Sequence, residues 1–234
     1  MTLSVRWCAA AMLCVLGCSP IVVTGALGDR VLRVSGTAAA WMDATEYVED
    51  SNGGAPVLRD RSTDAVVLHL VFTEAVFDAR ADLRSLPAGE REAVRADIAR
   101  GDQLRLDIRR GDVIRPGDRI KSVPSDGSLP PEVLPFVQNV ALELGEPVID
   151  ASSAYPERAP RVGSRLTATF NVTETSPKLA GEITVVANKA EGEGDGFLEG
   201  EVVVAFAVEL LPERLAECNF AELDQGVANA CDLN

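Results

Sequence analysis

Apolar and polar residues alternate along much of the chain, a pattern typical of strands that bury one face. The clearest case runs from Leu104 to Ile108, and residues 166–173 repeat it. Residues 202–210 also alternate, but both sides are mostly apolar there, which predicts a strand in the middle of a sheet. Further strands are predicted at 31–44, 66–77 and 183–187, while 136–144 fits a strand or a helix.

One helix is predicted, from about Pro87 to Arg100. Ser85 can serve near its N-cap, the fixed φ of Pro87 suits the first turn, and Gly101 is placed for a left-handed C-cap. Helical spacing predicts a buried stripe of Leu86, Val94 and Ile98. It also predicts two surface ion pairs, Glu92 with Arg95 and Asp97 with Arg100. Many strands and a single helix predict an all-β fold, an antiparallel β-sandwich of about seven to nine strands with one short helix over an open end or edge.

The chain of 234 residues has 36 acidic and 22 basic side chains, a formal charge of -14 with its one His neutral. This charge argues against nucleic acid as a partner, because a phosphate backbone is bound by a concentrated basic surface. Hydrophobic residues make up 47% of the chain, which is enough for a globular domain that buries a core.

The N-terminal residues have the form of an export signal. Arg6 supplies one positive charge, an apolar run follows from Trp7 to Leu16, and the run ends in Val15-Leu16-Gly17-Cys18. This segment resembles the signal peptide and lipobox of bacterial lipoproteins. The resemblance implies that the chain is cut before Cys18, and that this Cys carries acyl chains, palmitate among them, which anchor the protein stably to a membrane.

In Gram-negative lipoproteins, a residue other than Asp after the lipidated Cys implies onward transport to the outer membrane, and Ser19 stands at that position. Two alternatives stay open from the residues alone. An ordinary signal peptide cut near Val23-Thr24-Gly25 would release a soluble product, and an uncleaved segment from Trp7 to Leu27 would remain in the membrane.

The resemblance and the strand pattern together divide the chain. We expect a signal peptide at 1–17, an anchor and short linker at 18–28, the β-sandwich domain at 29–217 and a C-terminal tail at 218–234. Three of the five Cys residues lie in or at the end of the signal segment. The remaining pair, Cys218 and Cys231, predicts one disulfide in an oxidising compartment, which would tether the tail.

His69 is the only His, and it lies on a predicted strand beside Val67 and Val71, on the side opposite Leu68 and Leu70. We interpret it as a partly buried sheet residue, since the sequence indicates neither a cleft nor a partner for a general base. Gly-x-Ser-x-Gly is absent, a zinc site with several His ligands is excluded, and no Gly-rich phosphate loop joins a strand to a helix. No catalytic residue is therefore predicted.

The sharpest acidic feature is the loop Glu191-Gly192-Glu193-Gly194-Asp195-Gly196, whose acids stand at positions 1, 3 and 5 of a calcium loop. Position 12 is Val202 rather than the bidentate Glu that such loops require. We interpret the loop as a solvated hairpin tip, with Glu191, Glu193 and Asp195 as a weak candidate calcium site. We interpret a second acidic cluster in the same way, as solvated side chains: Asp43, Glu46, Glu49 and Asp50.

Arg-Gly-Asp occurs at 100–102 and at 110–112. Integrins recognise this triplet in some extracellular proteins. Here Gly101 is expected to end the helix and Gly111 to turn the chain after a strand, so we assign both triplets to turns.

These features favour a membrane-anchored envelope lipoprotein that acts as a noncatalytic binding or structural module. Its expected partners are the membrane, through the N-terminal lipid, and a protein or glycan of the envelope. A calcium-stabilised module is one alternative, and a carboxylate-based envelope hydrolase is another, because 36 acids include many possible pairs.

Overall fold

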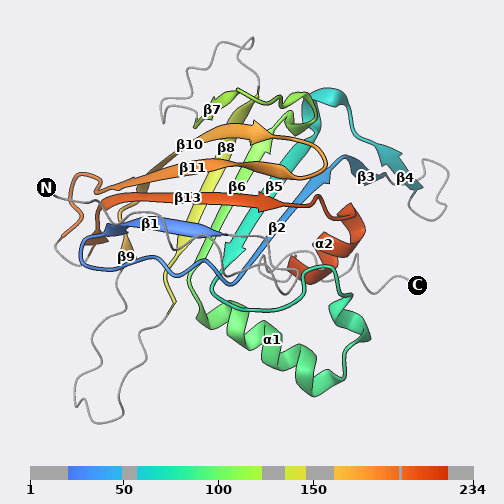
Figure 1. The fold of residues 1–234 in the computed structure, drawn as a ribbon, viewed down its shortest axis with the longest axis horizontal. Coiled ribbons are helices and arrows are strands. Elements are labelled where there is room, and N and C mark those ends of the chain that lie inside the picture. Colours follow the sequence, from blue (N-terminus) through green and yellow to red (C-terminus); the bar gives the residue numbers. More distant parts are fainter. Residues whose placement is uncertain (1–20, 49–56, 123–134, 146–160, 195–196, 221–234) are drawn as a thin grey trace, which may run out of the picture.

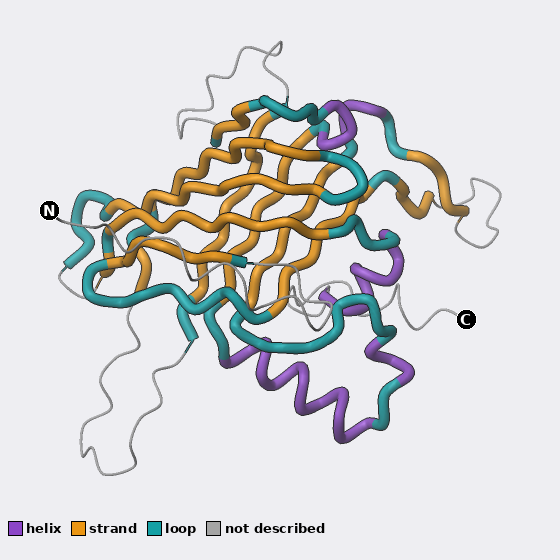
Figure 2. Tube along the Cα trace, in the orientation of Figure 1, coloured by secondary structure: helices purple, strands orange, loops and turns teal. Residues whose placement is uncertain are grey.

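Nine strands form two antiparallel sheets that pack face to face in the computed structural model (Figure 1). The structure describes residues 21–48, 57–122, 135–145, 161–194 and 197–220. Figure 2 shows the strands of one sheet crossing those of the other. The prediction of an all-β sandwich is confirmed.

The five-stranded sheet has the order β1 (Val22–Leu27), β13 (Gly200–Val208), β11 (Leu179–Asn188), β10 (Arg165–Glu174) and β7 (Arg119–Lys121). The four-stranded sheet has the order β2 (Thr37–Asp43), β5 (Val67–Thr73), β6 (Gln103–Arg109) and β8 (Phe136–Glu143). Two small pairs add β3 (Thr45–Val48) with β4 (Val57–Asp60), and β9 (Arg161–Val162) with β12 (Phe197–Leu198). Short 3-10 helices lie at Thr63–Ala65, Leu83–Ser85 and Gly111–Val113.

Side chains from the inner faces of both sheets form one apolar core. Every second residue of β6, from Leu104 through Leu106 to Ile108, is fully buried, as the alternation predicts. Aromatic rings join the sheets: the ring centroid of Phe206 lies 5.0 Å from that of Phe72 and 5.6 Å from that of Phe170. The core therefore comes from the period-two pattern.

Residues 22–27 form β1, whereas the sequence analysis places them in a linker. They pair with β13 along their whole length, from Val22 opposite Ala205 to Leu27 opposite Gly200. Gly25 permits this pairing, because its φ is +88° and a Cβ there would lie 2.2 Å from the Glu201 carbonyl oxygen. This strand was missed because it has no clear alternation and directly follows the apolar export segment.

The strand predicted at 31–44 begins only at Thr37, as β2. Leu32 and Val34 are buried as in a strand. The Arg33 N–H between them, however, donates to the carboxylate of Asp102 (2.8 Å) rather than to a neighbouring strand. The ambiguous segment at 136–144 is a strand, β8.

Helix α1 (Ala88–Arg100) lies where it was predicted, and both of its surface ion pairs form, at 3.4 Å for Glu92 with Arg95 and 3.3 Å for Asp97 with Arg100. Its N-cap is Pro87 and not Ser85, and only Ile98 of the predicted stripe is buried, whereas Leu86 and Val94 are half-buried. Its C-cap differs: Gly101 has φ -85° and ψ 168°, which is extended rather than left-handed. At the turn expected at Gly111, the residue with left-handed backbone is Arg110 (φ 56°), and Gly111 itself is buried.

A second helix, α2 (Glu213–Phe220), was not predicted. It includes Cys218, so the expected boundary between domain and tail at 217/218 falls inside a helix. No helix among the described residues has both the length and the apolar content needed to cross a membrane.

Candidate functional site

A row of side chains crosses the outer face of the four-stranded sheet. Strand register places Trp41 of β2 opposite His69 of β5, His69 opposite Asp107 of β6, and Asp107 opposite Asn139 of β8. These residues point away from the core because their neighbours on β5 and β6 point into it. We call these four residues the outer row.

The outer row is connected by contacts from end to end. The Trp41 and His69 rings stack with centroids 4.9 Å apart. His69 Nδ1 lies 2.8 Å from Asp107 Oδ1, and Asn139 Nδ2 donates to Asp107 Oδ2 at 3.1 Å. On the other side of the imidazole, Nε2 lies 3.8 Å from Asp43 Oδ2. The expectation that His69 has no partner is therefore wrong.

These contacts make His69 a cation at neutral pH. Burial alone would lower the pKa of His69, but the hydrogen bonds and charges of Asp107 and Asp43 outweigh burial and raise it from 6.5 to about 9. The pKa of Asp107 shifts in the opposite sense: burial raises it, whereas the His69 hydrogen bond and charge lower it below its ordinary value. A His that keeps its proton suits an ion pair better than a general base.

Helix α2 packs over the Trp41 end of the outer row. Phe220 stacks on Trp41 with centroids 5.7 Å apart, and the Phe77 ring lies 5.6 Å from Phe220. The buried Asn219 side chain of α2 binds the segment at 79–83. Its Oδ1 accepts from Leu83 N (3.1 Å), and its Nδ2 donates to the carbonyls of Ala79 (3.0 Å) and Ala81 (2.8 Å). These bonds fix α2 to the segment at 79–83, between β5 and α1.

Three carboxylates meet where α2 begins. Asp43, Glu213 and Glu217 each bring an oxygen within 4.8 Å of the other two, which is close enough for one cation. Glu213, however, already accepts from the N–H groups of Ala44 (3.2 Å) and Thr45 (3.1 Å) and from the Thr45 hydroxyl (2.7 Å). Asp43 is paired with Arg61, whose Nε lies 3.0 Å from Asp43 Oδ1. Glu213 is therefore fully engaged without an ion, whereas Asp43 Oδ1 is buried and has the Arg61 ion pair but no hydrogen bond.

The surroundings of Glu217 disfavour its charged form. Burial, followed by the negative charges of Glu213 and Asp43, raises the pKa of Glu217 above its ordinary value, and the positive charges of His69 and Arg61 oppose this only in part. Asp43 was predicted to be a solvated acid, and the structure instead places it between two cations. Of the other acids in that predicted cluster, Glu49 and Asp50 lie outside the described residues.

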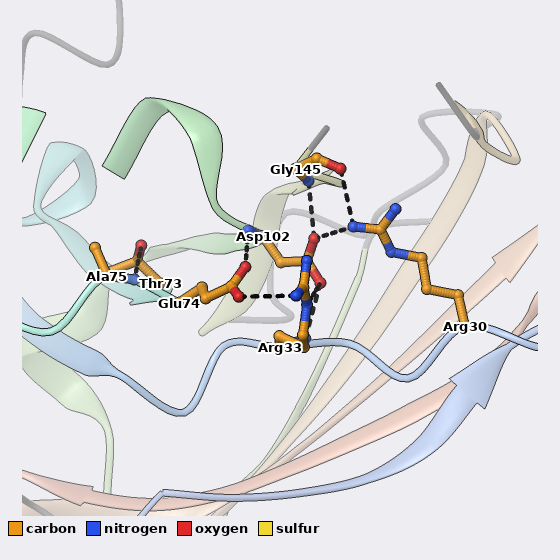
Figure 3. Close-up of polar contacts among 7 residues, drawn as sticks. All are labelled: Arg30, Arg33, Thr73, Glu74, Ala75, Asp102 and Gly145. Atoms are coloured by element: carbon orange, nitrogen blue, oxygen red, sulfur yellow. Dashed lines mark hydrogen bonds and ion pairs between the residues drawn. The ribbon is translucent and has the colours of Figure 1, made fainter. Parts of the chain in front are cut away.

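A second polar network surrounds the buried carboxylate of Asp102 (Figure 3). Arg30 donates to Asp102 Oδ1 and to the Gly145 carbonyl (2.9 Å), and Gly145 N donates to the same Oδ1 at 2.8 Å. Arg33 N donates to Oδ2 at 2.8 Å. Glu74 completes the network, since its carboxylate accepts from Asp102 N (3.2 Å) and pairs with Arg33 (3.1 Å).

This network joins four segments that are distant in the sequence: the chain after β1, the end of β5, the start of β6 and the end of β8. Asp102 is the Asp of the first Arg-Gly-Asp triplet, and it is fully buried. It cannot be presented to a receptor, which agrees with the structural interpretation of that triplet.

The acidic loop at 191–196 follows β11, and Glu193 has a definite structural role there. Its carboxylate accepts from Ala190 N (2.8 Å) and from Ser164 N (3.2 and 3.3 Å). Hydrogen bonds from Ser164 and Ala190 lower the pKa of Glu193 below its ordinary value. Glu193 is therefore more than a solvated loop residue. Glu191 is exposed, and Asp195 lies outside the described residues.

This geometry predicts that calcium does not stabilise the protein through the acidic loop, because both oxygens of Glu193 already accept N–H groups. Glu193→Gln is expected to lower the melting temperature, since the amide nitrogen would face one of those N–H groups. Glu191→Gln is the matched control and should leave it unchanged. Thermal unfolding with and without calcium measures both effects, and a calcium-dependent rise that disappears in both variants would contradict this prediction.

Of the three Cys residues predicted to be lipidated or disulfide-bonded, the structure describes only Cys218. Cys218 is buried in α2. Cys18 and Cys231 lie outside the described residues, so lipidation and the Cys218–Cys231 disulfide stay predictions. The structure does bring Trp41, His69 and Asp107 together. The sequence did not predict this, because no single segment determines which strands are neighbours in the sheet.

No protein-family model matches the chain, and the same holds for the curated proteins and the solved structures with which it was compared.

Proposed function

We propose that this protein is an envelope lipoprotein, anchored through acylated Cys18, whose β-sandwich acts as a noncatalytic binding or structural module for a protein or glycan of the envelope. One observation carries the anchoring part: β1 begins at Val22. A cut before Cys18 leaves this strand whole. A cut near residues 23–25 would divide it and remove part of its pairing with β13.

The uncleaved alternative conflicts with the same strand. An anchor from Trp7 to Leu27 would need residues 22–27 as part of a membrane-spanning segment, whereas these residues pair with β13 in the sheet. Ser19 after the lipidated Cys supports the outer membrane as the destination, on the resemblance to Gram-negative lipoproteins.

The noncatalytic part of the proposal is supported by what the polar side chains do. His69 forms an ion pair with Asp107, Asp102 holds backbone and Arg groups from two other segments, and Asn219 fixes α2. Each of these groups is engaged in holding elements of the fold together. We infer that the sandwich serves as a rigid body that the lipid places at the membrane surface.

Changing Cys18→Ser is expected to abolish acylation and leave the precursor uncut, because the sulfur that receives the lipid is gone. Cys14→Ser is the matched control: bulky Leu13 precedes Cys14, so this change should leave processing intact. Intact mass and the mass of the N-terminal peptide report both cleavage and acyl chains. The proposal fails if the Cys18→Ser protein is processed and fractionates with membranes as the parent does.

A further inference from the structure

Large apolar side chains are exposed on segments that run along one edge of the sandwich. Among the described residues, four large apolar side chains are exposed: Val22 (56%), Val31 (60%), Val76 (78%) and Leu210 (47%). Single exposed apolar residues are ordinary on a protein surface. These four, however, lie on segments that follow the β1 and β2 edges of the two sheets, and we call that side the β1/β2 side.

Each segment is placed there by a specific contact. Val22 lies on the edge strand β1, and Val31 lies on the connection from β1 to β2. The segment that carries Val76 passes against that connection, since a Cβ on Gly36 would lie 2.2 Å from the Glu74 carbonyl oxygen. Leu210 forms a parallel bridge with Ala40 on the free edge of β2.

The opposite side of the sandwich is closed by the protein itself. There β7 and β8 are joined by a parallel bridge between Ser122 and Val137. Figure 1 shows β7 on the side away from β1. The two outward residues of β7, Arg119 and Lys121, are exposed and charged.

Charged groups on the β1/β2 side are largely paired with one another. Arg33 and Glu74 lie 3.1 Å apart, and Arg80 and Glu209 lie 2.9 Å apart. Arg30 is paired with the buried Asp102. Asp29 and Asp78 on the same segments are exposed as well. This side therefore keeps only a few of the acids behind the net charge of -14, so a surface that contains anionic groups can approach it without strong repulsion.

The proposed lipid anchor is attached next to this side. Cys18 precedes Val22 by four residues, and four residues span at most about 14 Å. If Cys18 is acylated, Val22 at the start of β1 must lie within that distance of the bilayer surface.

We propose that the β1/β2 side faces the lipid bilayer, with Val22, Val31, Val76 and Leu210 at the level of the headgroups. This rests on the proposed function, because the tether exists only if Cys18 is acylated. Helix α1 lies on the same lower side in Figure 1, and its exposed charged residues Glu90, Glu92 and Arg100 argue against insertion below the headgroups.

The test uses the full lipidated protein in vesicles of phosphatidylethanolamine and phosphatidylglycerol that contain a lipid with a nitroxide headgroup. A fluorophore is attached at Val31→Cys or Leu210→Cys, and at Arg119→Cys or Lys121→Cys as matched controls on the far side. All four sites are exposed, so the substitutions should be tolerated. Mass spectrometry verifies the acyl chains and one label per chain, and circular dichroism verifies the fold.

We expect the nitroxide lipid to quench labels at 31 and 210 several-fold more than labels at 119 and 121. Equal quenching on both sides of an acylated protein would overturn the orientation while leaving the lipoprotein proposal intact. Labels at 31 and 210 that are shielded from a soluble quencher but not quenched by lipid would mean that a protein covers this side, which also overturns it. A protein without acyl chains would remove both proposals.

Discussion

Asp102→Ala is expected to lower the free energy of unfolding by about 3–5 kcal/mol, the range for breaking a buried charge pair by removing one partner. The Asp102 side chain is fully buried, and that of Arg30 is only 18% exposed. Without the carboxylate, the Arg30 guanidinium loses its counter-charge. The N–H groups of Arg33 and Gly145 lose their acceptor as well.

Two variants make this result specific. Asp97→Ala also removes an acid that is paired with an Arg, but both side chains of that pair are about two-thirds exposed, so the change should stay within about 0.5 kcal/mol. Asp102→Asn keeps the shape but presents an amide nitrogen to groups that donate, so it should be destabilising too. Urea unfolding measures all three, and an Asp102→Ala effect as small as that of Asp97→Ala would contradict the assignment.

The Asp102 network also shows what the sequence could not predict. Its members come from residues 30, 33, 74, 102 and 145, and no local pattern relates them. The one motif that includes Asp102, Arg-Gly-Asp, suggests a surface turn with an exposed acid, whereas the structure buries it. Only the fold, which brings the ends of β1, β5 and β8 to the start of β6, identifies its role.

Alternation predicted the core well because it is a local signal. Each inward residue of β6 was identifiable from its immediate neighbours, and so were the ion pairs of α1. Helix α2 was missed because it has only eight residues. A helix this short depends on packing, here of Phe220 against Trp41 and Phe77.

The outer row illustrates the same limit for the candidate site. The alternation places His69 on the outward side of its strand, and Asp107 on the outward side of another. That these two strands are neighbours, and in register, follows from the sheet order β2-β5-β6-β8. A polar residue on the outer face of a central strand is the signal that could have prompted a search for such a partner.

The stability of the protein is expected to fall at alkaline pH through His69. Its pKa is 6.5 in an unfolded chain and about 9 in the fold. The folded state therefore favours the protonated imidazole, and this stabilisation is fully present below pH 6.5 and lost as the pH rises through about 9. Since each pKa unit corresponds to 1.36 kcal/mol, the loss is roughly 3 kcal/mol.

Two variants separate this effect from other alkaline titrations. His69→Gln removes the ionisable group, and Asp107→Asn keeps the His but removes the carboxylate that holds its proton. The difference in unfolding free energy between the parent and His69→Gln should be largest below pH 6.5 and shrink as the pH passes the folded pKa of about 9. In Asp107→Asn the alkaline loss should be smaller and should begin at a lower pH.

His69 is the only His in the chain, so its ring-proton NMR signal can be followed without ambiguity. In the parent this signal should titrate near 9, and in Asp107→Asn it should titrate closer to 6.5. A parent His69 that titrates near its ordinary value would mean that the bond to Asp107 does not hold the proton. The ion pair between His69 and Asp107 would then contribute little to the stability of the fold.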